Sequence, residues 1–172
     1  MGNDFKDLFG DWRPDDTPPE PEGRAQRPLN EKEVKVVNVW EGILEPQGLF
    51  GNAETRQTYF IQLRDNQGRE FRIFVLRDMA LSISLALENE NPDRPFTHDL
   101  MKAILERMGA TIERVTIDDL WQDTFYAKVV ITYNGQTMEI DARPSDAIAL
   151  ALRFRAPIYV AEYVLEAAQH ES

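Results

Sequence analysis

The segment TFYAKVVITYNGQTMEIDARPSDAIALALRF, residues 124–154, predicts a hairpin followed directly by a buried helix. Asn134-Gly135 separates two runs of alternating residues, and this dipeptide is the strongest short signal for a two-residue hairpin turn. Pro144 suits the first turn of a helix, and the residues after it are apolar on all sides. We therefore expect a hairpin over 124–142 and a buried helix over 145–154.

The register of this hairpin predicts a polar cluster at its open end. Counting outward from the turn pairs Lys128 with Asp141 and places Tyr126 opposite Arg143 on the face away from the apolar pairs. The same end leads into the buried helix, so the polar side chains and the helix start should lie close together.

The start of the helix adds chemistry to this cluster. A helix N-terminus has free backbone N–H groups and favours anions. Arg143 beside it is suited to bind a phosphate with two parallel hydrogen bonds, and Asp141 and Asp146 could hold a divalent cation through oxygen ligands. Structural interpretations stand beside these: Lys128–Asp141 as a cross-strand pair, Ser145 as a cap and Asp146 as a complement to the helix dipole.

The rest of residues 34–172 alternates strands and helices in a similar order, which favours a single α+β domain with a mostly antiparallel, mixed sheet. The expected strands are 34–41, 57–64, 69–76, 111–117 and 158–161, and the expected helices are 79–90, 98–108 and 162–168. The run Ile83–Leu87 resembles Ile148–Leu152 at an offset of 65. Either the two halves arose by duplication, or buried helices have converged on Ile, Ala and Leu.

The first 33 residues differ from the rest, because they are acidic and hold five of the ten prolines. We interpret residues 1–33 as a flexible N-terminal segment. Within it a stripe spaced i, i+3, i+4 and i+7 predicts either a helix that docks on a protein partner or a second copy, or a chance pattern. Its residues are Phe5, Leu8, Phe9 and Trp12.

Composition excludes several classes of protein. The chain has 172 residues, a formal charge of −11 and no cysteine, so disulfides, thiolate zinc sites and thiol nucleophiles are excluded. No apolar run is long enough to span a membrane, and the acidic N-terminus does not resemble a signal peptide. We expect a cytoplasmic protein without membrane association. Nucleic-acid binding would need a local basic patch or bound metal ions, because the overall charge repels a polyanion.

A second candidate site is the helix that follows Pro95. We expect Thr97 to be its N-cap and Gly109 to end it. Asp99 complements the helix dipole, whereas His98 is either a general acid or base or a hydrogen-bonded surface histidine.

Three motifs together resemble the bifunctional nuclease domain family. They are Arg94–Leu100 (RPFTHDL), Asp123–Ala127 (DTFYA) and Asp141–Ala151 (DARPSDAIALA), in this order along the chain. The resemblance covers roughly residues 34–168. It implies an α+β domain that forms a homodimer and acts on both DNA and RNA.

One segment departs from the family pattern. The family usually has an Ile-Gly-x-x-Glu-Ala segment after the first hairpin, and here residues 75–80 are Val-Leu-Arg-Asp-Met-Ala. Leu76 therefore occupies the glycine position and Met79 the glutamate position. A role of that glutamate in metal binding or catalysis would be lost in this chain.

Two functions follow from the resemblance and the polar clusters. The first is a metal-assisted nuclease, and the second is a non-catalytic regulatory or interaction module with the same fold. In the nuclease, Mg²⁺ or Mn²⁺ would be held by carboxylates and would generate the attacking hydroxide. The residues expected to act are His98, Asp99, Asp141, Arg143 and Asp146 in catalysis, Asp99, Asp141 and Asp146 as metal ligands, and Lys128, Tyr126, Ser145 and Thr97 in substrate binding.

Overall fold

The structure is a computed structural model that describes residues 29–44 and 56–170. Within these residues one sheet contains seven strands and four helices accompany it. The strands are β1 (Glu31–Leu44), β2 (Arg56–Asp65), β3 (Glu70–Val75), β4 (Thr111–Trp121), β5 (Thr124–Tyr133), β6 (Gln136–Ala142) and β7 (Ile158–Ala161). The helices are α2 (Arg77–Glu88), α3 (Thr97–Met108), α4 (Pro144–Phe154) and α5 (Glu162–His170). The domain is α+β, as the sequence predicts.

Two antiparallel meanders flank the short strand β7 in the sheet. The strand order is β3-β2-β1-β7-β4-β5-β6. β7 is antiparallel to β1 and parallel to β4, so β1 and β4 run in opposite directions. A two-fold axis through β7 would relate two such meanders. Each meander is followed by a helix, α2 or α4, in agreement with the similar halves of the sequence; their origin by duplication stays a prediction.

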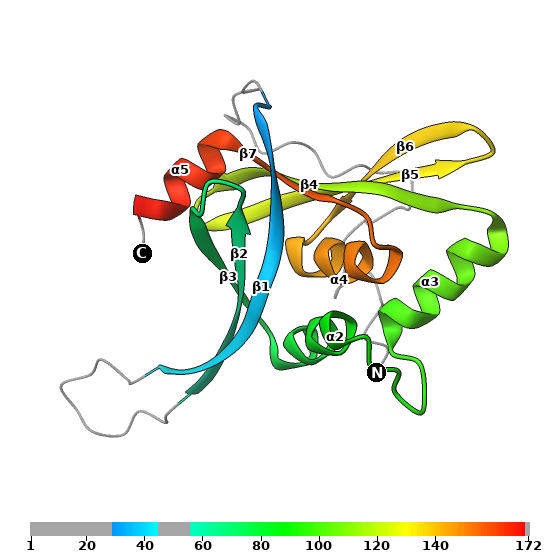
Figure 1. Cartoon of the computed structure of the whole chain (residues 1–172), viewed down its shortest axis with the longest axis horizontal. Coiled ribbons are helices and arrows are strands. Elements are labelled where there is room, and N and C mark those ends of the chain that lie inside the picture. Colours follow the sequence, from blue (N-terminus) through cyan, green and yellow to red (C-terminus); the bar gives the residue numbers. More distant parts are fainter. Residues whose placement is uncertain (1–28, 45–55, 171–172) are drawn as a thin grey trace, which may run out of the picture.

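The hydrophobic core surrounds α4. Figure 1 shows α4 between β4 above it and α2 below it, with α3 on the right and α5 at the far corner near β7. The apolar residues Ala147 to Ala151 of α4 are all buried, as its all-round apolar sequence predicts. Phe71 of β3 contacts Phe125 of β5, with ring centroids 6.1 Å apart, so the two ends of the sheet bend toward one another over the core.

The hairpin register expected from the sequence is confirmed. Tyr133 pairs with Gln136 and Lys128 with Asp141, and the turn residues Asn134 and Gly135 have φ values of 51° and 74°. Positive φ at both positions is the type I′ geometry that this dipeptide favours.

Strand β4 is longer than expected and continues to Trp121. A second two-residue turn, Gln122-Asp123, joins it to β5 with φ values of 47° and 58°. The sequence does not reveal this turn, because Gln and Asp at positive φ are a much weaker signal than Asn-Gly.

The docking stripe at 5–12 is not among the described residues. Among the helices of the described part, none combines the length and the hydrophobicity needed to cross a membrane.

Candidate functional site

A hollow of about 810 Å³ lies between α3, β5, β6 and the start of α4. We call it the α3–β6 hollow. Its polar lining comes from Thr97, His98, Asp141, Arg143 and Asp146. The rest of the lining is apolar and consists of Met79, Met101, Ile104, Leu105, Val129, Ile131, Ile140, Ala142 and Leu150. The hollow therefore has a charged end at the start of α4 and a larger hydrophobic part.

Arg143 and Asp146 form the charged end of this hollow. Arg143 is the last residue before α4, and Asp146 lies in the first turn of that helix. The guanidinium donates from Nε to Oδ2 of Asp146 at 2.7 Å and from Nη2 to Oδ1 at 3.2 Å. The Arg143 side chain is nevertheless 67% exposed. The pair thus holds an exposed arginine in a fixed position beside a helix N-terminus.

A buried histidine also contacts Asp146. Nε2 of His98 lies 3.1 Å from Oδ1 of Asp146, and Nδ1 lies 3.0 Å from Oγ of Ser82. Because an ionised carboxylate only accepts hydrogen bonds, Nε2 donates to it, and in the neutral imidazole Nδ1 accepts from the serine hydroxyl. This chain of contacts joins α2, α3 and α4 at one point.

The contacts of Asp146 stabilise its ionised form. The hydrogen bond from His98, and after it the hydrogen bond from Arg143, lower the pKa of Asp146 to about 2 against the opposing effect of partial burial. The same ion pair raises the pKa of Arg143. Both side chains are charged at neutral pH, and the carboxylate oxygens of Asp146 are already used by its two partners.

His98 differs from the exposed acid or base that the sequence allows as one interpretation. It is only 2% exposed, and both ring nitrogens have protein partners. A side chain in this position orients Asp146 and, through it, Arg143. We therefore describe His98 as a positioning residue.

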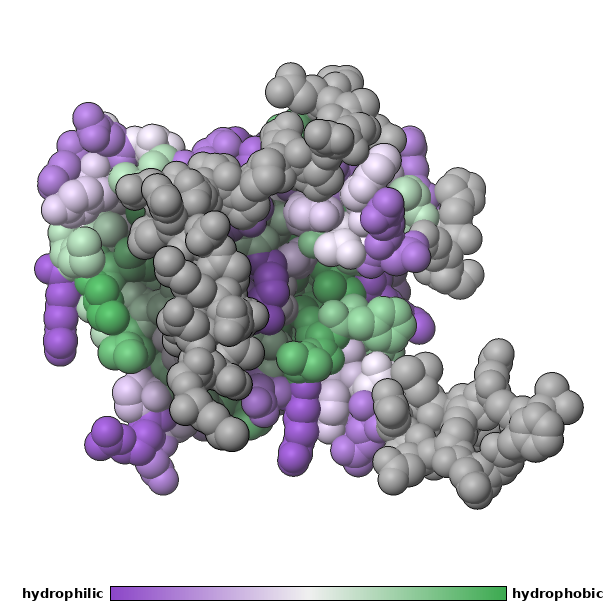
Figure 2. Space-filling view, turned by 180° about the vertical axis from the view of Figure 1, so that it is seen from behind, coloured by the Kyte–Doolittle hydropathy of each residue, from purple (hydrophilic) through white to green (hydrophobic). Residues whose placement is uncertain are grey.

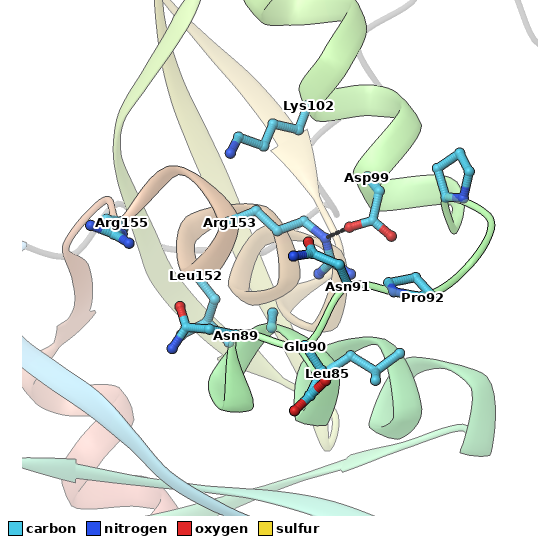
Figure 3. A pocket seen from close by; sticks show the side chains of 12 residues that line it. Leu85, Asn89, Glu90, Asn91, Pro92, Asp99, Lys102, Leu152, Arg153 and Arg155 are labelled. Carbon is cyan, nitrogen blue, oxygen red and sulfur yellow. Dashed lines mark hydrogen bonds and ion pairs between the residues drawn. The ribbon is translucent and has the colours of Figure 1, made fainter.

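Asp99 lies in a different place from the other expected site residues. Its Oδ1 accepts from Nε of Arg153 at 2.6 Å, and Figure 3 shows this bond beside a separate hollow of about 470 Å³. Burial raises the pKa of Asp99, but the hydrogen bonds from Arg153 and from the backbone N–H of Phe96 outweigh this effect and lower it. Phe96 occupies the N-cap position, so Thr97 is the first helical residue and not the N-cap that the sequence predicts.

The expected trio of metal ligands does not form a common site. Asp141 and Asp146 line the α3–β6 hollow, whereas Asp99 lines the hollow around Arg153. Over residues 29–44 and 56–170, no group of three or more His, Asp or Glu side chains comes together to hold a metal ion. The described residues thus do not fit a resident three-carboxylate metal centre.

Of the expected substrate-binding residues, Thr97 lines the α3–β6 hollow, whereas Lys128 and Tyr126 are not part of its lining. Lys128 lies opposite Asp141 in the sheet, but its ammonium group is 3.4 Å from Asp118 and 3.6 Å from Glu139. β6 ends at Ala142, so Arg143 leaves the sheet for α4 and is not the cross-strand partner expected for Tyr126.

Ser145 has little contact with solvent. It is buried in the first turn of α4, and it lines a third hollow of about 300 Å³ between α4 and the end of β3.

The sequence does not indicate two important residues, Ser82 and Arg153, whose side chains contact His98 and Asp99. Met79, which the sequence singles out as a departure from the family pattern, lines both hollows that Arg143 lines. A polar residue within an apolar helix face, as at Ser82 beside Ile83, is the signal that could have indicated such a contact.

The fold and the site together define an α+β domain with an exposed, fixed arginine at the start of a buried helix. The model of the bifunctional nuclease domain family matches residues 61–172, well over half of the chain. The chain belongs to this family.

Curated relatives agree with this assignment. An uncharacterized protein of Mycobacterium tuberculosis is 35% identical over 133 residues, which cover 77% of this chain and 73% of that protein. Bifunctional nuclease 1 of Oryza sativa subsp. indica is 29% identical over 58% of this chain and 31% of its own length. Bifunctional nuclease 1 of Arabidopsis thaliana is 27% identical over 60% and 33%, respectively. The chain thus matches about a third of each plant protein.

Proposed function

We propose that this chain is a cytoplasmic nuclease that cleaves phosphodiester bonds in DNA and RNA at the charged end of the α3–β6 hollow. The observation that carries the proposal is the Arg143–Asp146 pair, in which an exposed guanidinium is fixed beside the free N–H groups of α4. Both groups favour a phosphate anion. The relatives named as nucleases support the reaction class.

The roles of the side chains follow from their exposure and partners. Arg143 binds non-bridging phosphate oxygens and stabilises the charge that develops on them in the transition state. Asp146 and His98 hold it in place. Asp141 is exposed and lines the same hollow, so it is the candidate general base that accepts a proton from the attacking water.

The decisive assay uses the purified full chain on single- and double-stranded DNA and RNA. Reactions run with Mg²⁺, with Mn²⁺ and with EDTA, because metal dependence stays a prediction. Arg143→Gln should reduce cleavage at least about tenfold, since one lost stabilising contact of about 1.4 kcal/mol has that effect.

Arg77→Gln is the matched control. Arg77 is exposed and begins α2, the helix that follows the first meander as α4 follows the second. The substitution therefore removes the same charge from a similar position. The proposed site is contradicted if both variants lose cleavage activity equally. It is also contradicted if Arg143→Gln cleaves at the full rate of the parent. Thermal unfolding of each variant verifies that the fold is retained.

A second candidate function, the interaction module, is favoured by the hydrophobic surface of α3. Figure 2 shows hydrophobic side chains gathered at the left, on the side where α3 lies. The exposed residues are Leu100, Met101, Ile104 and Met108 on α3 and Met138 and Ile140 on β6. An exposed apolar face of this extent is typical of a protein interface.

We propose that this surface forms the homodimer that the family resemblance implies. Ile104→Glu should lower the molar mass measured by light scattering, while Leu81→Glu, on an equally exposed position of α2, should not. A dimer without cleavage under any condition would favour the interaction module. Deletion of residues 1–12 tests separately whether the N-terminal segment recruits a protein partner.

A further inference from the structure

Three aromatic side chains form a row across the outer face of the first meander. Trp40 of β1 is the cross-strand neighbour of Phe60 of β2, and Phe60 is the neighbour of Phe74 of β3. Val39, Ile61 and Ile73, which are next to these residues along their strands, belong to the core or pack against it, so the three rings face away from it. Trp40 is 47% exposed and Phe74 is 68% exposed. We call these three residues the aromatic row.

The rings of the aromatic row are held by neighbouring side chains. The indole N–H of Trp40 donates to Oε1 of Gln62 at 2.6 Å. Phe60 and Phe74 meet edge to face with centroids 6.2 Å apart, and the guanidinium of Arg72 lies 4.8 Å above the Phe60 ring. Large apolar rings are therefore fixed in position at the surface, although exposed core-type residues cost solubility when they have no role.

From Lys35 to the aromatic row this face has a net positive charge, opposite to that of the whole chain, and the acidic Glu33 lies just beyond this stretch. Along the same face of β1–β3, from Lys35 to the aromatic row, the cations are Lys35, Arg64 and Arg72 and the single acid is Glu70. Arg64 is paired with Glu70, and the hydrogen bond from Arg64 lowers the pKa of that carboxyl. A cationic strip on a protein with a net charge of −11 is a local basic patch of the kind that polyanion binding needs.

The aromatic row also adjoins the candidate active site. The hollow of about 300 Å³ between β3 and α4 is lined by Phe74 and by Arg143. Leu76 and Met79 belong to the same lining. A ligand bound on the row can thus extend through this hollow to the arginine that we place at the phosphate.

We propose that the aromatic row is a binding surface for single-stranded nucleic acid. Bases stack on aromatic side chains irrespective of sequence, and arginines beside the rings contact the phosphates. Neighbouring strands are about 4.8 Å apart, so the row spans about 10 Å and accommodates two or three nucleotides. A duplex cannot use it, because its base faces are already stacked. The inference rests on the proposed nuclease function and specifies its substrate as a single strand.

The test measures binding without cleavage. Fluorescence anisotropy of a labelled twelve-nucleotide dT or rU strand is recorded with the full chain in EDTA at low salt. Stacking contributes about 1–3 kcal/mol per base, so Phe74→Ala should raise the Kd at least about fivefold. Phe74 is largely exposed, so the variant should fold normally.

Two further variants complete this test. Leu81→Ala, at an exposed apolar position of α2 outside the proposed dimer surface, is the matched control and should bind like the parent. Arg72→Gln should lower the slope of log K against log salt by about 0.7, as expected for one lost phosphate contact on a single strand.

The outcomes separate this inference from the proposed function. The inference is overturned if Phe74→Ala and Leu81→Ala have equal Kd values. It is also overturned if the chain binds a duplex and a single strand with equal affinity. If Phe74→Ala changes the molar mass but not the affinity for the oligonucleotide, the aromatic row is a protein interface, and this outcome also overturns the inference. If Arg143→Gln binds the strand but does not cleave it, both proposals are supported. If binding depends on Phe74 but the parent protein does not cleave the strand, only the proposed nuclease function is rejected.

Discussion

The two meanders share one topology but bury their helices to different depths. In α4, seven residues are buried, whereas α2 buries only Ala80, Ser82 and Ile83. Figure 1 shows the reason, because α4 has the sheet on one side and α2 on the other, while α2 lies at the edge of the helical layer. The same unit of a meander and a helix thus contributes a buried helix, α4, in the second half and a partly exposed helix, α2, in the first.

The starts of the two helices differ in chemistry as well. The third residue of α4 is Asp146, which has both Arg143 and His98 as partners. The third residue of α2 is Met79, which is half-buried in the lining of both hollows that contain Arg143. The charged site belongs to the second meander, and the first contributes an apolar wall and the aromatic row.

The largest expected effect is on stability, at matched leucines of the two helices. Leu150 is buried in α4, and Leu85 of α2, its counterpart in the similar runs Ile148–Leu152 and Ile83–Leu87, is half-buried. Leu150→Ala should lower the free energy of unfolding by about 3 kcal/mol, because it leaves a cavity in the core. Leu85→Ala should cost about half as much. Urea unfolding measures both, and equal losses would contradict the difference in depth.

Removal of His98 should have the next largest effect. His98→Ala leaves Ser82 and the Asp146 carboxylate without a buried partner, at a cost of about 2 kcal/mol. Because the folded pKa of Asp146, about 2, is below its ordinary value of 3.8, its contribution to stability is present above about pH 4 and is lost as the pH falls toward 2. This loss between pH 4 and pH 2 should be smaller in the variant.

Carboxyl chemical shifts in an NMR titration test the same contact directly. The pKa of Asp146 should rise in His98→Ala, while the lowered pKa of Glu70, on the first meander, should not move. An unchanged Asp146 pKa would mean that Arg143 alone stabilises the carboxylate.

A substitution at Met79 would make the two helix starts more alike. Met79→Glu introduces the carboxylate that the family resemblance leads us to expect at this position, within the lining that includes Arg143. We expect about a tenfold gain in Mg²⁺- or Mn²⁺-dependent cleavage, equivalent to about 1.4 kcal/mol of transition-state stabilisation. Met101→Glu, in the apolar part of the same hollow, is the control. A gain in both variants, or in neither, would show that position 79 has no special role.

The smallest expected effects compare an ion pair from each half. Arg153→Ala removes the cation that pairs with the partly buried carboxylate of Asp99. Because the Arg153 side chain is only 6% exposed, we expect the free energy of unfolding to fall by about 1–2 kcal/mol. Arg64→Ala breaks the solvent-exposed pair with Glu70 and should cost less than about 0.5 kcal/mol. Thermal unfolding at two salt concentrations distinguishes them, because only the exposed pair is screened strongly.

Several elements were determined by the sequence alone, because their signals are local. Asn134-Gly135 fixed the hairpin and its register, Gly109 ended α3 with a φ of 80°, and the apolar run after Pro144 made a buried helix. Turn type, helix capping and hydrophobic pattern depend on neighbouring residues, so they can be recognised along the chain. The three family motifs are local in the same sense.

The partners of the polar side chains were decided only by the tertiary structure. His98 lies between Ser82 and Asp146, which are distant from it in the sequence, and Asp99 pairs with Arg153 rather than with the other two carboxylates. Likewise the aromatic row exists only because β1, β2 and β3 align in one register. Charge and hydrogen-bond partners are set by the packing of helices and strands from different parts of the chain, and no local pattern specifies that packing.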